Sequence, residues 1–243
     1  MTRTEAMRIQ RALARAGVAS RRRAEELVAA GRVQVNGAVA RTGQSVDPAH
    51  DRITVDGVAI GLPAEVRWIV LHKPPGVMTT RSDPEGRRTV FDLVEAVPGL
   101  TYVGRLDYMT EGVLLLTTDG AAAHGLTHPS REIPRTYVAT VRGRIPDAVK
   151  RLRRGVELDD GVVTPSDIEA RSLGGGRWDL ELTIAEGRTR EVRRVCEAVG
   201  LEVLRLVRTR FGPVTLGKLP AGETRALTSS ERRQIAALTR VER

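Results

Sequence analysis

Residues 104–120 read Gly104-Arg105-Leu106-Asp107-Tyr108-Met109-Thr110-Glu111-Gly112-Val113-Leu114-Leu115-Leu116-Thr117-Thr118-Asp119-Gly120. The uninterrupted apolar run Val113–Leu116 predicts a buried segment, to which the polar stretch before it is anchored as a loop. That loop places one carboxylate, Asp107, directly after an arginine. An Asp followed by Thr and Glu is also an ordinary helix start or turn. Asp107 is therefore a candidate for chemistry, although its local sequence alone favours a structural role.

The composition is that of a globular protein with an excess of positive charge. The 243 residues are enough for one large domain, or for a small domain and a medium one. Only 3% of residues are aromatic, so the core must rest on aliphatic side chains. The 39 Lys and Arg residues against 30 Asp and Glu residues give a formal net charge of +9. This excess indicates a polyanionic partner, with a basic surface that binds nothing as the alternative.

The sequence carries no feature of a secreted or membrane protein. The single cysteine, Cys196, cannot form an internal disulfide. The N-terminal residues Met1–Glu5 do not begin an apolar stretch, and no segment has the uninterrupted apolar length that spans a bilayer. We therefore expect a soluble cytoplasmic protein with no membrane attachment.

The first sixty residues predict two helices followed by a small sheet. Apolar spacing predicts one helix over residues 7–16 and a second from the N-cap Ser20 to Gly31. Asn36-Gly37 and Asp56-Gly57 predict hairpin turns. The second helix begins with Arg21-Arg22-Arg23, where each cation opposes the helix dipole by roughly a few tenths of a kcal/mol. This arrangement favours contact with nucleic-acid phosphate over a merely solvated helix start.

After a short linker at residues 61–65, strands and helices are mixed. The pattern predicts a strand Trp68–Leu71, a basic loop over 80–88, helices Val90–Ala96 and Ala121–Leu126, a strand Arg135–Val141, a helix after Pro146, a hairpin over 166–184, a helix striped by Val192, Val195, Cys196 and Val199, and a strand Leu204–Arg210. In the strand Arg135–Val141, Tyr137 falls on the same face as Ala139 and Val141.

Two motifs resemble a zinc site and a phosphate-binding loop, but the residues around them do not support either assignment. His124 and His128 share the spacing of a zinc pair, but the glutamate of a zinc hydrolase motif and a third ligand are missing, so no metal site is predicted. The glycine run Gly174–Gly176 lies between strands and does not open a helix, so it is not a phosphate-binding loop.

Residues 7 to 60 resemble the small RNA-binding domain named after ribosomal protein S-four. The shared segments are Leu13-Ala14-Arg15-Ala16-Gly17, Ala19-Ser20-Arg21-Arg22 and Gly31-Arg32-Val33-Gln34-Val35-Asn36-Gly37. The resemblance implies that the basic helix start and the nearby strand contact structured RNA. Candidate RNA-binding residues are therefore Arg21, Arg22, Arg23 and Arg32.

The order of the remaining motifs resembles the ribosomal pseudouridine synthases of the RsuA/RluB type. The motifs are Lys73-Pro74-Pro75-Gly76, Asp83-Pro84-Glu85-Gly86-Arg87, Gly104-Arg105-Leu106-Asp107, Thr136-Tyr137-Val138, Gly187-Arg188-Thr189-Arg190-Glu191-Val192-Arg193-Arg194 and Arg208-Thr209-Arg210-Phe211-Gly212-Pro213. The resemblance implies an α+β fold. We expect an αα-β RNA-binding domain over residues 1–62 and a catalytic domain over residues 66–243, with a mixed, mainly antiparallel sheet flanked by helices.

The resemblance also implies the roles of three residues. Asp107 is the nucleophile, Tyr137 packs against the flipped uracil, and Arg193 is the basic partner of the aspartate. The residue types suit the chemistry, because a carboxylate forms covalent intermediates and an arginine keeps it ionised. They leave open whether Asp107 attacks the ribose or the base. Arg105, Arg190 and Arg194 are further RNA-binding candidates, of which Arg105 holds a phosphate, wedges into the RNA helix or pairs with a local acid.

The resemblance implies isomerisation of a specific uridine in ribosomal RNA, with 23S RNA of the large subunit favoured by the front-domain segment. We expect a monomer that needs no metal, redox centre or nucleotide cofactor and acts on ribosomal RNA or a pre-ribosomal particle. Thr189 and Glu191 stand where such synthases usually carry Asn and Gln, which bears on substrate detail. The main alternative is a non-catalytic RNA-binding or ribosome-assembly protein; a helix-turn-helix DNA regulator is disfavoured by the hairpin that follows the second helix.

Overall fold

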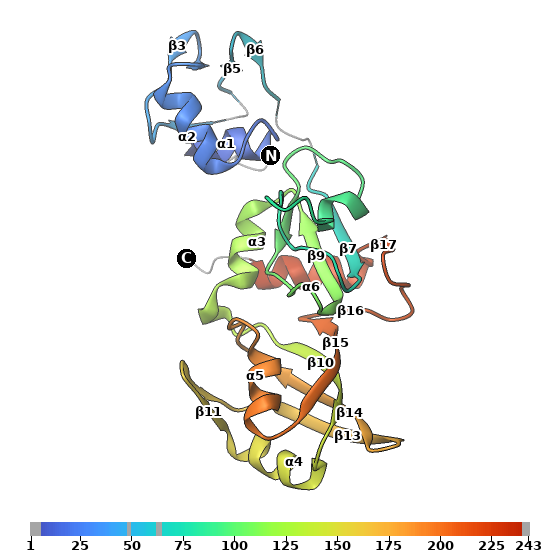
Figure 1. Ribbon diagram of the computed structural model, residues 1–243. Helices are drawn as coiled ribbons and strands as arrows, with labels where there is room; N and C mark the ends of the chain where they lie inside the picture. Colours follow the sequence, from blue (N-terminus) through green and yellow to red (C-terminus); the bar gives the residue numbers. More distant parts are fainter. Residues whose placement is uncertain (1–5, 48–49, 62–64, 240–243) are drawn as a thin grey trace. The chain divides into compact units, whose positions relative to one another are not determined.

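The computed structural model describes residues 6–47, 50–61 and 65–239 (Figure 1). Residues 1–5 of the expected leaderless N-terminus and residues 62–64 of the expected linker lie outside the described residues. The chain forms two compact units. The first comprises the chain up to Arg67 with segments 96–101 and 117–120, and the second comprises the rest. Within the described ranges, no helix has both the length and the apolar character needed to cross a membrane.

The first unit packs two helices against short strands. Helix α1 (Ile9–Arg15) and helix α2 (Arg21–Ala29) bury aliphatic side chains, and Ser20 caps α2 by accepting a hydrogen bond from the Arg23 amide at 3.2 Å. The strands are β1 (Met7–Arg8), β4 (Ser45–Val46), β2 (Val33–Val35), β3 (Ala38–Val39), β5 (Ile53–Val55) and β6 (Val58–Ala59). Four of them form an antiparallel sheet in the order β3-β2-β5-β6, joined through the two predicted hairpins.

The prediction of a helix from residue 7 is wrong by two residues. Met7 and Arg8 form β1, which pairs antiparallel with β4. The first helix then begins at Ile9, whose amide donates to the Gln44 carbonyl at 2.8 Å.

The second unit is built on one mixed sheet in the order β13-β14-β10-β15-β9-β7-β17. These strands are β13 (Ser166–Gly174), β14 (Arg177–Ile184), β10 (Arg135–Arg142), β15 (Glu202–Phe211), β9 (Glu111–Thr117), β7 (Trp68–Lys73) and β17 (Thr224–Ala226). Strands β15 and β9 pair in parallel, whereas the pairs β13–β14, β14–β10, β10–β15 and β7–β17 are antiparallel. The predicted mixed, mainly antiparallel sheet is confirmed.

Helices flank this sheet at both ends of the strand order. Helices α3 (Gly120–Thr127) and α6 (Ser229–Thr239) lie near β9 and β7, and helices α4 (Ile145–Arg154) and α5 (Glu191–Ala198) lie near β10, β13 and β15 (Figure 1). The remaining short elements are β8 (Thr101–Val103), β11 (Val156–Leu158), β12 (Gly161–Val163), β16 (Val214–Thr215) and the 3₁₀ turns η1 (Val90–Leu93) and η2 (Pro129–Arg131).

The apolar run that follows the Asp107 loop is the centre of the core. Every residue of β9 is buried, and the burial predicted for the apolar run Val113–Leu116 is confirmed. Gly112 lies at the point where β9 meets β15, with a φ of +109°. A Cβ atom there would lie 2.2 Å from the Arg208 carbonyl oxygen, so only glycine allows the two strands to meet.

The predicted helix Val90–Ala96 is wrong. Only the 3₁₀ turn η1 forms, and it begins with a capping box in which Asp92 accepts the Thr89 amide at 2.7 Å. The chain is extended again at Val94.

Candidate active site

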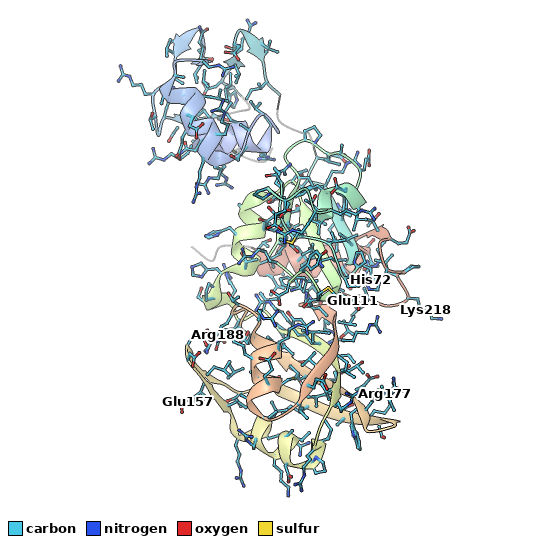
Figure 2. The ribbon with its side chains drawn as sticks, in the orientation of Figure 1. His72, Glu111, Glu157, Arg177, Arg188 and Lys218 are labelled. Atoms are coloured by element: carbon cyan, nitrogen blue, oxygen red, sulfur yellow. The ribbon has the colours of Figure 1, made fainter. Side chains whose placement is uncertain are left out.

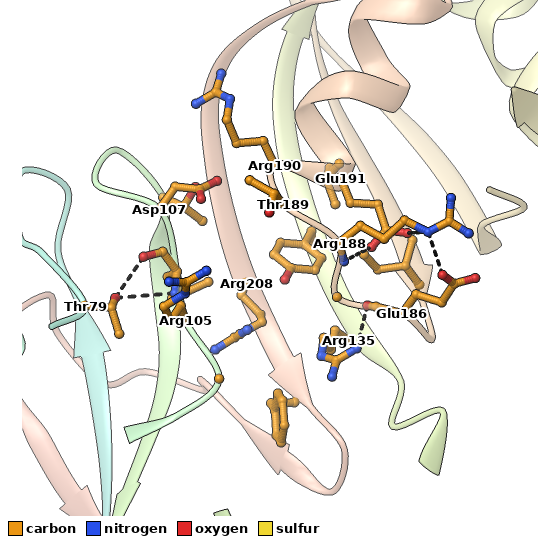
Figure 3. Close-up of a pocket in the computed structure, with 18 of the residues that line it drawn as sticks. Thr79, Arg105, Asp107, Arg135, Glu186, Arg188, Thr189, Arg190, Glu191 and Arg208 are labelled. Atoms are coloured by element: carbon orange, nitrogen blue, oxygen red, sulfur yellow. Dashed lines mark hydrogen bonds and ion pairs between the residues drawn. The ribbon is translucent and has the colours of Figure 1, made fainter. Parts of the chain in front are cut away.

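A cleft of about 720 Å³ opens in the second unit, beside the loop that precedes β9. Its walls come from three parts of the chain (Figure 3). Arg105 and Asp107 lie on one side, and Thr189 and Glu191 lie on the segment before and at the start of α5. Strands β10 and β15 run between these two sides and contribute Tyr137, Arg135 and Arg208.

The loop that carries Asp107 is held from both ends. Its turn is closed by the Thr110 amide, which donates to the Asp107 carbonyl at 3.0 Å. Buried Leu106 lies against the core, and its carbonyl accepts the Thr79 hydroxyl at 2.8 Å. The half-buried Asp107 carboxylate makes no hydrogen bond or ion pair with any residue that the structure describes. The loop therefore presents a half-buried carboxylate to the cleft.

A fully buried lysine fixes the backbone around Asp107. Lys73, at the end of β7, is 0% exposed. Its Nζ donates to the carbonyls of Pro74, Tyr108 and Thr110 at 3.0, 3.1 and 2.9 Å. The bonds to Tyr108 and Thr110 hold the backbone just after Asp107 in place. Burial lowers the pKa of Lys73 to about 8, against the opposing attraction of Asp107 and Glu111.

Tyr137 and Arg208 are neighbours across the β10–β15 ladder. Tyr137 is buried and reaches the cleft from β10. Arg208 is 2% exposed, and its Nε donates to the Val113 carbonyl at 2.8 Å, whereas its buried Nη2 has no partner. The Arg135 and Arg208 guanidinium groups both lie over the Phe211 ring, 5.4 and 5.2 Å from its centroid. Burial lowers the pKa of Arg135, helped by the charge of Arg208.

Arg193 lies on α5 and reaches back to the Asp107 loop. Its Nη2 donates to the Met109 carbonyl at 3.2 Å. Burial lowers the pKa of Arg193, as does the nearby charge of Arg190, and the charge of Asp107 opposes both effects. Arg193 and Asp107 thus interact electrostatically, without a direct ion pair in the described part of the chain.

The other sequence-predicted cations fall into three groups. Arg105 and Arg190 are exposed and line the cleft. Arg194 is tied to Asp160 through two hydrogen bonds of 3.0 and 2.8 Å, which hold the pKa of that carboxyl below its ordinary value.

The third group lies in the first unit. Arg21, Arg22, Arg23 and Arg32 are exposed there. Arg23 pairs with Glu26, and Arg32 pairs with Asp56 across the hairpin. All four side chains are thus at the surface of the first unit, whereas the residues of the Asp107 cleft belong to the second unit.

Glu191 is a second carboxyl group at the cleft wall. It is 3% exposed, and its Oε2 accepts the Arg188 amide at 3.1 Å, whereas Oε1 has no hydrogen-bond partner. Burial raises the pKa of Glu191. Arg188 donates to the Glu186 carboxylate and to the carbonyls of Asp160 and Gly161, so it connects this wall to the turn between β11 and β12.

No cluster of three or more metal-ligating side chains occurs among residues 6–47, 50–61 and 65–239. The two histidines with zinc-like spacing, His124 and His128, pack edge to face with ring centroids 5.8 Å apart. His128 also caps η2 by accepting the Ser130 amide.

Sequence reasoning missed Lys73, Arg135 and Arg208 as parts of this site. Lys73 was marked only as part of a shared motif, and its charge at the end of an apolar strand was the available signal. Arg208 was also part of a shared motif, but its position on a predicted strand gave no sign of burial, because basic residues there are normally exposed.

Comparison with known proteins yields two family matches. Residues 67–198 match the model described as RNA pseudouridylate synthase, and residues 7–53 match the S4 domain. The chain is 45% identical over 231 residues to an uncharacterised RNA pseudouridine synthase of Mycobacterium tuberculosis, covering 93% of this chain and 91% of that protein. It is 41% identical over 235 residues to ribosomal large subunit pseudouridine synthase B of Bacillus subtilis, covering 95% and 96%. A crystal structure of pseudouridylate synthase aligns with a TM-score of 0.64 at 26% identity, covering 94% of this chain and 99% of that one.

Proposed function

This chain belongs to the RNA pseudouridylate synthase family, and we propose that it converts one specific uridine of 23S ribosomal RNA to pseudouridine. The choice of RNA is supported by the similar synthase of Bacillus subtilis, which is named for the large ribosomal subunit. The assignment of the site rests mainly on one observation: the Asp107 carboxylate has no hydrogen-bond or ion-pair partner among the described residues and lines the same cleft as Tyr137.

We propose Asp107 as the nucleophile. The reaction breaks the bond between ribose C1′ and uracil N1, turns the base, and joins C5 to C1′. Asp107 forms a covalent bond with the ribose or the base while the base is detached, and that bond breaks when C5 attaches. The base loses one proton from C5 and gains one at N1, so atoms and electrons balance without a co-reactant.

Two neighbours support this role. Arg193 and Asp107 attract each other electrostatically, so the guanidinium helps to position the carboxylate. The Tyr137 ring packs against the detached uracil and keeps it in the cleft, because base and ring offer each other flat apolar faces.

We further propose how the RNA is held. Residues 1–62 act as the RNA-binding domain, with Arg21, Arg22, Arg23 and Arg32 at exposed positions for phosphate contacts. Residues 66–243 act as the catalytic domain, with Arg105 and Arg190 at the cleft and Arg194 on the same helix as Arg193. The protein acts as a cytoplasmic monomer on ribosomal RNA or a pre-ribosomal particle.

The test is a pseudouridine map of ribosomal RNA from cells with and without this protein. We expect one site in 23S RNA to lose its modification, and purified protein to restore it on a 23S transcript but not on a 16S transcript. An unchanged map together with RNA binding would instead indicate a non-catalytic assembly role.

A further inference from the structure

Three cations are buried around the cleft without an ion pair. Lys73, Arg135 and Arg208 are 0%, 8% and 2% exposed, and none of them pairs with a carboxylate among the residues that the structure describes. An unpaired buried charge normally costs several kcal/mol of stability, so it persists where it serves a function.

Among these three cations, Arg208 is the one with a buried terminal nitrogen, Nη2, that has no hydrogen-bond partner. Lys73 donates to three carbonyls, and Arg135 donates to the carbonyls of Ala185 and Glu186. Arg208 uses only Nε, and neither of its terminal nitrogens makes a hydrogen bond in the described part of the chain. Among the residues that the structure describes, the Arg208 guanidinium therefore contacts the Val113 carbonyl and the Phe211 ring, and no carboxylate.

The nearby carboxylates do not compensate Arg208. Glu111 is bound by Arg205 through two hydrogen bonds of 2.9 and 2.7 Å. Glu191 is held by the Arg188 amide on the other wall. Asp107 is the proposed nucleophile, and its charge is used in the reaction. An uncompensated positive charge thus faces the cleft.

The position of Arg208 is set by the sheet itself. Its backbone pairs with Gly112 of β9 on one side and with Tyr137 of β10 on the other. Directly opposed residues of an antiparallel pair point to the same face of the sheet, so the guanidinium lies on the face that carries the Tyr137 ring. A cation held in this way needs no rearrangement when a negative charge forms next to it.

We propose that Arg208 stabilises the negative charge that the uracil base acquires when its bond to the ribose breaks. This rests on the proposed function. When the C1′–N1 bond breaks, its electron pair stays on the base and spreads over N1, O2 and O4. Arg208 stabilises this anion from the cleft wall without giving it a proton. The base becomes neutral when C5 joins C1′, and it stays neutral overall because it then loses the C5 proton and gains one proton at N1.

A backbone phosphate is a poorer occupant of this position. The phosphates remain attached to the RNA strand, whereas the base turns furthest into the cleft. Exposed Arg105 and Arg190 are suited to phosphate contact at the cleft walls. Arg208, at 2% exposure beside Tyr137, is placed for the base.

The test compares two leaving groups. A 23S transcript is made with uridine or with 5-fluorouridine, whose fluorine withdraws electrons and stabilises the detached base by itself. The single-turnover consumption of the target nucleoside is measured for wild type, Arg208→Gln and Arg208→Lys. Arg142→Gln is the matched control, because exposed Arg142 pairs with Glu202 at the far end of β10.

For Arg208→Gln we expect a loss of about 100-fold or more with uridine, as for removal of a charge-stabilising donor, and a loss of about tenfold or less with 5-fluorouridine. Arg208→Lys keeps a charge and should show a smaller loss with the same dependence on the base. If thermal unfolding shows that Arg208→Gln does not fold, the comparison of Arg208→Lys with wild type is used as the test. Arg142→Gln should match wild type.

Equal losses on both substrates would overturn the role of Arg208, because a merely structural residue does not distinguish leaving groups. The wild-type reaction separates this result from a failure of the proposed function. If wild type forms no pseudouridine in the uridine transcript, the proposed function itself is refuted.

Discussion

Replacing Lys73 by Met tests how the Asp107 loop is held. Methionine has a similar length and no charge, so the change removes three hydrogen bonds from the carbonyls of Pro74, Tyr108 and Thr110 without leaving a large cavity. Two of these carbonyls belong to the loop that carries Asp107. We therefore expect both stability and catalysis to fall.

The magnitude follows from two opposing effects. Hydrogen bonds from a charged donor contribute about 1.5–3 kcal/mol each. Burial opposes them, because lowering the pKa of Lys73 from its ordinary value of 10.5 to about 8 corresponds to a cost of about 3 kcal/mol for keeping the ammonium charged. The expected net loss of unfolding free energy in Lys73→Met at pH 7 is about 3 kcal/mol.

The pH dependence has a definite sign. The folded-state pKa of Lys73 lies below the unfolded value, so between about pH 8 and about pH 10.4 the unfolded chain holds a proton that the folded chain lacks. The stability of wild type relative to Lys73→Met should therefore rise with pH across this window. Catalysis by wild type should fall above about pH 8, because an amine holds the loop carbonyls less firmly than an ammonium does.

The assay is urea unfolding at pH 7, 8, 9 and 10, with single-turnover rates at pH 7, 8 and 9. The matched control is Lys218→Met, which removes an exposed lysine that projects outward between β16 and β17 (Figure 2). Wild-type stability and turnover in Lys73→Met at pH 7 would refute the proposed anchor.

Two further substitutions test the packing around the cleft. Gly112→Ala should lose roughly 3 kcal/mol or more of unfolding free energy in urea unfolding, because the new Cβ would lie 2.2 Å from the Arg208 carbonyl oxygen and φ at this position is positive. The control Gly120→Ala has open space around its new Cβ and should unfold like wild type. Similar unfolding of both variants would contradict the account. The unfolding free energy of Glu191→Gln should rise relative to that of wild type as pH rises from acidic to neutral. Burial raises the folded-state pKa of Glu191, so the wild type loses stability as that carboxyl ionises. A constant difference between the two proteins in urea unfolding across the pH series would count against this explanation.

The sequence predicted the elements whose cause is local. The apolar run Val113–Leu116 gave a fully buried strand, Ser20 capped a helix, and the Asn36-Gly37 turn joined two strands. Each depends on residues close together in the chain. The resemblance to a known family supplied the sheet type and the candidate site.

The rest depends on contacts between distant residues. Three consecutive residues of β15, from Leu206 to Arg208, are buried, so this central strand is covered on both faces. Alternation along the sequence cannot reveal that burial. The ion pair of Arg194 with Asp160 likewise joins residues 34 positions apart. The helix predicted from Val90 is limited to the 3₁₀ turn η1, because the backbone is extended again at Val94.

The nucleophile assignment is tested most directly by pseudouridine formation in a 23S transcript with purified wild type and Asp107→Asn. Asparagine keeps the size of the side chain but cannot form the covalent bond. We expect no pseudouridine from Asp107→Asn, with affinity for the transcript within about twofold of wild type, since each factor of ten in affinity is about 1.4 kcal/mol. Pseudouridine formed by Asp107→Asn at the wild-type rate would contradict the account.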